Sequence, residues 1–460
     1  MKTSLKLLIW LYVILLIGEG ALRKWVFPGW SDPLLVVRDP VLLAIYILAL
    51  ATDEFPGNRW TVALIILAVL STVFSFLGGH NNLVVLGYGL RVNYLHVPLI
   101  WIMGRVLNRR DVERLGAFLL IMAIPMAFIM VQQFRAPMNA VINRGVGYAE
   151  IGQIFGADGR IRPPGLFAFI TGPQLFFPLC AAFFFDEISG AKRLPWYLIA
   201  ACGLAITIAL SISISRTVML ATVAVAVAFL CMLPFSSIRF GSLMRPVLLL
   251  ALIGVGLFQL PVFRESTSVF MMRWDTAEAG TSQTSWGGLA DRTARSFTNP
   301  YYYLKMAPMY GHGIGTGSNV GARLTSGEMG FLLAEEEWGK ILLELGPLLG
   351  LAFILFRVAL TGWLGLLAWR ALRERHNLLP LLIFAAVGLT ILQGQWAPPT
   401  VLGFAVVGGG LLLGALNPAP ARVPAGSERA PAPTALPATA FLAPLPEPNE
   451  RRLPSVLRPR

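Results

Sequence analysis

The sequence predicts an all-α polytopic protein that crosses a membrane about twelve times. Of its 460 residues, 56% are hydrophobic and only 13% are charged, and the mean hydropathy is +0.68. A soluble domain carries about twice that charged fraction. Apolar runs of about 15 to 21 residues recur along the chain, close to the ~20 residues that cross a ~30 Å hydrocarbon core as a helix. These observations exclude an ordinary soluble domain.

Each predicted span is an apolar run between polar or turn-forming residues. The first run follows Lys2 and Lys6, as in a signal peptide, but no small-residue cleavage site follows it, so we expect it to remain as a span. Cys180, Cys202 and Cys231 lie inside runs without pairing or metal-ligand spacing and are interpreted as small core residues. The twelve runs are Leu7–Leu22, Val37–Ala51, Trp60–Leu77, Leu83–Met103, Leu115–Val131, Leu166–Phe185, Trp196–Ile214, Val218–Leu233, Val247–Val262, Ile341–Leu360, Leu378–Leu392 and Val401–Leu416.

The net charge of +13 reports on topology here, because basic residues gather in loops of one parity. Those loops follow spans four, six, eight and ten, so the positive-inside rule places them and both termini in the cytoplasm. The basic residues concerned are Arg105, Arg109, Arg110, Arg114, Lys192, Arg193, Arg239, Arg245, Arg370, Arg373 and Arg375. Arg23, Lys24 and Arg38 run against this pattern. A bilayer therefore explains the basic balance, and we expect no nucleic-acid partner.

Two outward segments exceed the length of a turn, residues 132–164 and 263–340. The second has seven basic and eight acidic residues, so it is not a simple anion-coating patch. Residues 417–460 are dominated by Pro and Ala, which predicts a disordered cytoplasmic tail. We therefore expect one transmembrane domain over residues 1–416.

Chemistry is expected in the polar stretch between Asp291 and Gly346, because it keeps charged side chains beside a membrane. Within it, GHGIGTGSN places glycines at 311, 313, 315 and 317. Glycines let the backbone approach a ligand or form a tight turn, and both alternatives are open. The pattern is neither a Walker motif nor a dinucleotide fingerprint. His312 could titrate near neutral pH, although a solvated loop histidine is the commoner case.

Three arginines lie near the predicted outer ends of spans. Arg216 follows Ser215 between spans seven and eight, where it could face a wet cavity or extend to the lipid headgroups. Arg160 and Arg162 precede span six, and Pro163 stiffens their approach. Guanidinium groups on a fixed segment suit a phosphate-bearing ligand, and interfacial anchoring is the alternative.

Span four carries polar residues within an apolar run: Arg91, Asn93 and His96, with Pro98 close behind. Such residues should line a cavity or pair internally, or the segment should be a broken helix. His96 is not expected to bind metal. The four histidines, His80, His96, His312 and His376, show no ligand spacing, so no metal site is predicted.

Carboxylates cluster before span ten, at Glu335, Glu336 and Glu337, and Glu344 follows within the span. Carboxylates at a helix N-terminus interact favourably with its dipole, so capping is one reading. A carboxylate at a membrane mouth among apolar residues could also serve as a general base.

In their order and spacing, these motifs resemble the O-antigen ligase and polymerase superfamily. Its members are integral-membrane glycosyltransferases that act on polyprenyl-diphosphate-linked glycans at the outer face of the bacterial inner membrane. The shared marks are the Ser215-Arg216 pair, the RPPGLF sequence, Arg292 shortly before PMYGHGIG, and the E-L-G triplet from Glu344 to Gly346. The resemblance extends to about Leu416 and includes the large loop between spans nine and ten.

The resemblance implies that Arg216 and Arg292 hold the donor diphosphate and that Glu335 is the third catalytic residue. Glu335 stands where the ligase branch has a histidine, a departure that favours a polymerase or a related exopolysaccharide enzyme. The residues expected to bind substrate are Arg91, Arg160, Arg162, Arg295 and His312.

The sequence thus predicts a membrane glycosyltransferase of surface polysaccharide synthesis in the bacterial inner membrane. Its partners would be a polyprenyl-diphosphate-linked glycan donor, a glycan or lipid-glycan acceptor and the bilayer. No cofactor is expected, because the donor already contains the activated bond. A membrane transporter or flippase of lipid-linked glycans or other solutes is the alternative, and a structural scaffold of an envelope assembly is a third.

Overall fold

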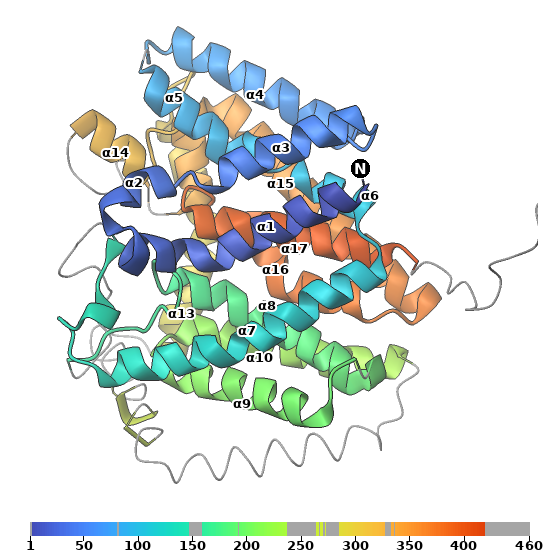
Figure 1. Ribbon diagram of the computed structural model, residues 1–460. Helices are drawn as coiled ribbons and strands as arrows, with labels where there is room; N and C mark the ends of the chain where they lie inside the picture. The colour runs from blue at the N-terminus through green and yellow to red at the C-terminus, as the bar shows by residue number, and fades with distance from the viewer. Residues whose placement is uncertain are drawn as a thin grey trace, which may run out of the picture. The chain divides into compact units, whose positions relative to one another are not determined.

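The computed structural model describes residues 2–80, 82–146, 159–191, 193–236, 264, 265, 267–269, 272, 285–326, 333, 334 and 336–418. Over this part the chain is helical, without strands (Figure 1). The helices are α1 (Lys2–Ala21), α2 (Ser31–Leu34), α3 (Arg38–Ala51), α4 (Arg59–Leu77), α5 (Leu83–Leu90), α6 (Leu99–Val106), α7 (Arg109–Arg135), α8 (Thr171–Asp186), α9 (Trp196–Ile212), α10 (Arg216–Met232), α13 (Ser285–Met306), α14 (Asn319–Ser326), α15 (Glu337–Arg375), α16 (Leu379–Gln393) and α17 (Pro399–Leu416).

Eight helical segments in the described part are long and apolar enough to cross a bilayer. They are Lys2–Val26, Pro28–Ala51, Arg59–Leu77, Leu83–Val106, Arg109–Arg135, Arg216–Phe235, Glu337–Arg375 and Pro399–Leu416. Helices α9 and α16 are apolar but shorter, with 17 and 15 residues. The predicted run Val247–Val262 lies outside the described residues, as does the tail from residue 419. The multi-pass helical class is confirmed, and the count of twelve spans stays a prediction.

Local capping chemistry fixes where several helices begin. The side chain of Asn108 accepts a hydrogen bond from the backbone N–H of Asp111, and the Asp111 carboxylate accepts one from the backbone N–H of Asn108, forming a capping box before α7. Asn58, Asn82 and Ser215 cap α4, α5 and α10 in the same way with one side-chain oxygen each.

The helices present two ends, which we call the basic end and the loop end. The basic end carries residues 52–58, 107–108, 187–195 and 376–378, and the loop end carries the segments before α3, before α5, before α8 and before α15. Contacts define the basic end: Lys6 pairs with Asp111 at 2.6 Å, and the Asn417 side chain donates to Leu107 O at 2.8 Å.

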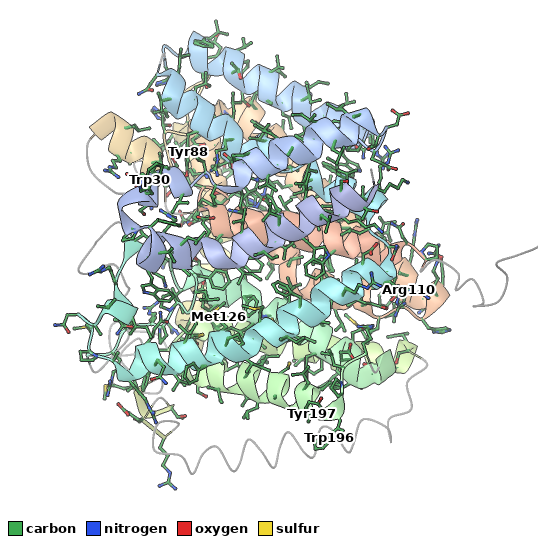
Figure 2. The ribbon with its side chains drawn as sticks, viewed as in Figure 1. Trp30, Tyr88, Arg110, Met126, Trp196 and Tyr197 are labelled. Atoms are coloured by element: carbon green, nitrogen blue, oxygen red, sulfur yellow. The ribbon has the colours of Figure 1, made fainter. Side chains whose placement is uncertain are left out.

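Aromatic side chains mark both ends. Figure 2 shows Trp196, Tyr197 and Arg110 at the basic end and Trp30 and Tyr88 at the loop end. Trp196 is 74% exposed and Trp30 is 68% exposed. Exposed tryptophans at both ends of a bundle of apolar helices are typical of membrane–water interfaces.

The core is centred on α17, in which every residue from 401 to 415 is buried. It packs against α16 and α6, and also against α7 and α8. Its small residues allow this approach: a Cβ added to Gly408 would lie 2.5 Å from Val387, and one added to Gly410 would lie 2.6 Å from Met103. Small residues at helix contacts are how membrane helices gain van der Waals packing.

Helix α15 is a hairpin of two helices rather than one rod. Gly346 has a φ of 78°, in the left-handed region, and Pro347 follows it. Glu337 Oε1 lies 2.9 Å from Arg357 Nη1, although a straight helix would separate positions 20 residues apart by ~30 Å. A Cβ on Gly350 would likewise lie 2.9 Å from Leu342 Cα. The arm from Glu337 therefore runs antiparallel to the longer arm.

The basic residues that contradicted the positive-inside pattern are buried structural groups. Arg23 pairs with Glu19 at 3.3 Å, Arg38 pairs with the same carboxylate at 3.2 Å, and Lys24 donates to Gly165 O at 2.8 Å. Residues inside the protein do not act as topological signals in the way that loop residues do. Their presence at the loop end is therefore consistent with the predicted orientation.

Candidate functional site

The sequence-predicted site residues that the structure describes belong to segments at the loop end. Arg216 is the first residue of α10, Arg160 and Arg162 lie in the segment before α8, and His312 lies in the glycine loop before α14. Arg292 and Arg295 are on α13, and Arg295 is exposed. Glu335 and the side chain of Arg292 lie outside the described residues.

Arg216 is half-buried at the start of a 17-residue helix. The preceding Ser215 caps this helix by accepting from Val218 N, and Gln174 of α8 donates to the Ser215 hydroxyl at 3.3 Å. The helix N-terminus and the guanidinium both carry positive charge, so this corner attracts anions.

Arg160 is anchored within the fold. Its Nη2 lies 2.5 Å from Glu265 Oε1, its Nη1 donates to Phe134 O at 3.0 Å, and its guanidinium lies 5.2 Å from the centre of the Phe134 ring. A phosphate would have to compete with Glu265 for this group. Arg162, two residues later, is half-buried. These contacts hold Arg160 within the fold, and ligand binding and interfacial anchoring both stay predictions for it.

The glycine loop packs against the turn of the α15 hairpin. His312 N donates to Leu343 O at 2.8 Å, and Gly317 N donates to the buried carboxylate of Glu344 at 2.8 Å. A Cβ at Gly311 would overlap the Glu344 carbonyl, so this close approach requires glycine. The tight-turn reading of the motif is observed.

A small cavity of about 190 Å³ lies beside the glycine loop. Its lining combines the end of α4, the start of α5 and the loop: Ser75, Gly79, His80, Asn82, Val85, Leu86, Gly313, Ile314 and Thr316. The rings of His80 and His312 are 6.5 Å apart. Partial burial, and then the nearby His80, lower the pKa of His312 below its ordinary value. His312 is therefore neutral at pH 7 and able to accept a proton or a hydrogen bond.

The carboxylates before the hairpin have separate roles. Glu336 accepts hydrogen bonds from Asn299 at 2.7 Å and Tyr303 at 3.4 Å, both on α13. Glu337 is buried and bridges Lys340 at 2.8 Å and Arg357 at 2.9 Å. Because Glu337 is paired with two cations, these contacts favour Glu335 and Glu336 over Glu337 as the base. Glu336 fixes the hairpin to the helix that carries Arg292.

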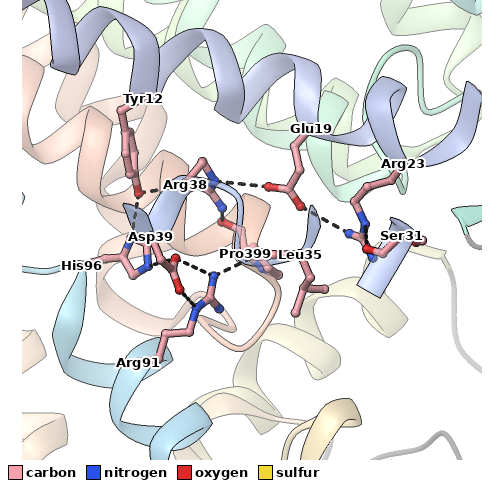
Figure 3. A network of polar contacts seen from close by, with 10 residues as sticks. All are labelled: Tyr12, Glu19, Arg23, Ser31, Leu35, Arg38, Asp39, Arg91, His96 and Pro399. Atoms are coloured by element: carbon pink, nitrogen blue, oxygen red, sulfur yellow. Dashed lines mark hydrogen bonds and ion pairs between the residues drawn. The ribbon is translucent and has the colours of Figure 1, made fainter. Parts of the chain in front are cut away.

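A break in span four, one of the alternatives that the sequence left open, is observed. A π-helical turn at Arg91–Leu95 separates α5 from α6, and Arg91, Asn93 and His96 are buried. Of the alternatives open for Arg91, internal pairing is observed, because Arg91 forms a two-point ion pair with Asp39 (Figure 3).

Sequence reasoning missed the partners of Arg91. Asp39 also binds His96, and Tyr12 and Glu19 belong to the same network (Figure 3). The available signal was the presence of Glu19 and Asp39 in apolar surroundings, since an ionisable residue inside a span needs a partner. Which groups pair could not be read from their positions, since Asp39 and Arg91 are 52 residues apart.

In the described part of the chain, no three His, Cys, Asp or Glu residues gather as metal ligands. Comparison with known proteins adds no further guide. No protein family, no curated protein and no solved structure matches this chain.

Proposed function

We propose that this protein transfers a glycan from a polyprenyl-diphosphate carrier to a hydroxyl of an acceptor sugar. The supporting observation is the placement of arginines from separate segments at one end of a membrane-length helical bundle. Arg216 begins α10, Arg160 and Arg162 precede α8, and Arg292 and Arg295 lie on α13. The same end contains a carboxylate-rich hairpin and a neutral histidine.

The leaving group explains why arginines belong in such a site. A lipid diphosphate gains negative charge as the glycosidic bond breaks, so cations already in place stabilise the transition state more than the ground state. Arg216 and Arg292 would hold this diphosphate, aided by the positive N-terminus of α10. The lipid chain would lie against the apolar helices while the sugar occupies the loop end.

A base must take the proton of the acceptor hydroxyl. Glu335 is proposed for this role, with Glu336 and His312 as the remaining candidates, since Glu337 is occupied by Lys340 and Arg357. By the positive-inside rule, the loop end would face outward from the bacterial inner membrane. Polysaccharide polymerisation or ligation at that face is the biological role that we propose.

Transfer is tested with purified protein in lipid nanodiscs that contain a lipid-linked glycan and an acceptor. Lysine keeps the charge of arginine but loses its two-point fork, so Arg216→Lys and Arg292→Lys should each slow transfer about tenfold or more, which corresponds to ~1.4 kcal/mol. Arg370→Lys, an exposed position at the basic end, is the matched control and should be silent. Normal turnover in both site variants would refute the assignment.

The base is tested by Glu335→Gln. The wild-type rate should rise with pH as the base ionises, and this variant should lose that rise and most of the activity. If a folded triple variant of Glu335, Glu336 and Glu337 to Gln transfers at the original rate, none of these three is the base.

A transporter of lipid-linked glycans is the second candidate. Buried ion pairs favour it, since Glu337, Lys340 and Arg357 meet between helices, and ionisable groups within a bundle often mark transport pathways. Vesicles distinguish the two functions: a transporter would move the donor across the bilayer without forming a new glycosidic bond. Donor movement without product would replace the first proposal with the second.

A further inference from the structure

The network in Figure 3 has two halves, and the first is held by Glu19. One carboxylate oxygen of Glu19 lies 3.3 Å from Arg23, and the other lies 3.2 Å from Arg38. Arg38 uses its other two nitrogens on Tyr12 OH at 3.3 Å and Pro399 O at 2.5 Å. Arg23 also donates to Ser31 O at 2.9 Å. One carboxylate therefore serves two arginines.

The second half is held by Asp39. Arg91 donates to both of its carboxylate oxygens through Nε and Nη2. His96 Nε2 lies 3.2 Å from Asp39 Oδ1, and His96 Nδ1 lies 2.8 Å from Tyr12 OH. These contacts are all satisfied by a neutral imidazole, in which Nε2 donates to Asp39 and Nδ1 accepts from Tyr12. His96 then adds no charge.

Counted over the residues that the structure describes, the network is one negative charge short. Arg23, Arg38 and Arg91 carry three positive charges, against two on Glu19 and Asp39. All three arginines are at least nine-tenths buried. A buried cation without a counter-charge is costly, so an anion is expected nearby. The exposed Asp32 does not fill this place, because it pairs with Arg323 at 3.6 Å.

The missing contact is at Arg91. Its Nη1 is buried and has no hydrogen-bond partner in the described part of the chain, so its two N–H groups lack an acceptor there. The Tyr88 ring lies 5.7 Å from the guanidinium.

We propose that a phosphate group binds here and accepts hydrogen bonds from Arg91 Nη1. Phosphate fits because its oxygens accept charge-assisted hydrogen bonds and its charge balances the surplus. This site is distinct from Arg216 and Arg292, and it rests on the proposed function only for what carries the phosphate. A lipid-linked phosphate and a free phosphate share the required chemistry.

The test measures binding by calorimetry on the full chain in detergent, with inorganic pyrophosphate as the probe. Wild-type protein should bind it, and Arg91→Lys should bind about tenfold more weakly or worse, because Lys loses the free Nη1 donor. Arg323→Lys, an exposed arginine at the same end, should match the wild type. A second titration with a short-chain prenyl diphosphate identifies which molecule carries the phosphate. Binding tighter than that of pyrophosphate assigns the site to a lipid carrier, and equal binding assigns it to free phosphate.

Two results would overturn the proposal: no pyrophosphate binding by the wild type, or binding that Arg216→Lys removes and Arg91→Lys leaves intact. The second result would leave the proposed transfer standing. If Arg91→Lys loses pyrophosphate binding but neither the wild type nor any variant transfers glycan, the phosphate site is supported and the proposed transfer is refuted.

If Arg91→Lys fails to fold, the Asp39→Asn variant tests the phosphate site instead. This change raises the surplus to two positive charges and frees the fork of Arg91, so pyrophosphate should bind more tightly. If the pair of Arg91 and Asp39 has only a structural role, pyrophosphate binding to Asp39→Asn should be weaker or unchanged. That result would count against a phosphate site.

Discussion

Replacing Glu337 with glutamine removes the counter-charge of Arg357, whose side chain is fully buried. Breaking a buried ion pair by removing one partner costs ~3–5 kcal/mol, because the remaining charge stays out of water. Arg357 would keep its bonds to Ile391 O at 2.9 Å and Gly394 O at 2.8 Å, and its guanidinium would keep its contact with the Trp396 ring at 3.9 Å.

These remaining contacts place the expected loss toward the lower limit, about 3 kcal/mol. Lys340 loses its charged partner as well, but the side-chain oxygen of the glutamine can still accept a hydrogen bond from Lys340. A loss of ~3 kcal/mol is a large fraction of the ~5–15 kcal/mol that separates folded from unfolded protein. Glu337→Gln should therefore lower expression and unfolding midpoint together.

The assay is equilibrium unfolding in mixed micelles, followed by tryptophan fluorescence. Glu374→Gln, at an exposed position on the same helix, is the control and should change stability by less than ~0.5 kcal/mol. Combining Glu337→Gln with Arg357→Met should cost less than the sum of the two single changes. The reasoning is refuted if Glu337→Gln alone loses less than about 1 kcal/mol, because the buried pair would then not hold the hairpin.

Two further predictions concern topology and pH. In a Cys231→Ser background, Gly57→Cys at the basic end should react with an impermeant thiol reagent only from the cytoplasmic side, and Asn139→Cys at the loop end only from the outside; the opposite labelling would reverse the orientation. The lowered pKa of His312 means that the unfolded chain binds the proton more readily, so stability should fall as pH drops through about 6.5, the ordinary histidine pKa. His312→Asn should flatten that slope in unfolding measurements between pH 7 and pH 5, and an unchanged slope would assign it to another group.

Part of the site was predictable because it depends on residue type and local spacing. Arg91, Asn93 and His96 in an apolar run predicted a cavity lining, internal pairing or a broken helix, since backbone and polar groups in a membrane need partners. Similarly, the glycines around His312 predicted either a turn or a ligand loop. The structure adds the surface that they approach, the carbonyl side of the α15 hairpin turn.

The sequence by itself determined that this is a multi-pass helical protein, because the length and apolarity of each run are local properties. It did not determine the hairpin at Gly346, since an apolar pattern continues through the turn and only the return of Glu337 to Arg357 reveals it. It also did not determine that Glu19 and Asp39 balance Arg23, Arg38 and Arg91. Ion pairing within a bundle depends on which helices pack together, so only the tertiary structure decided which charges are satisfied and which donor is left over.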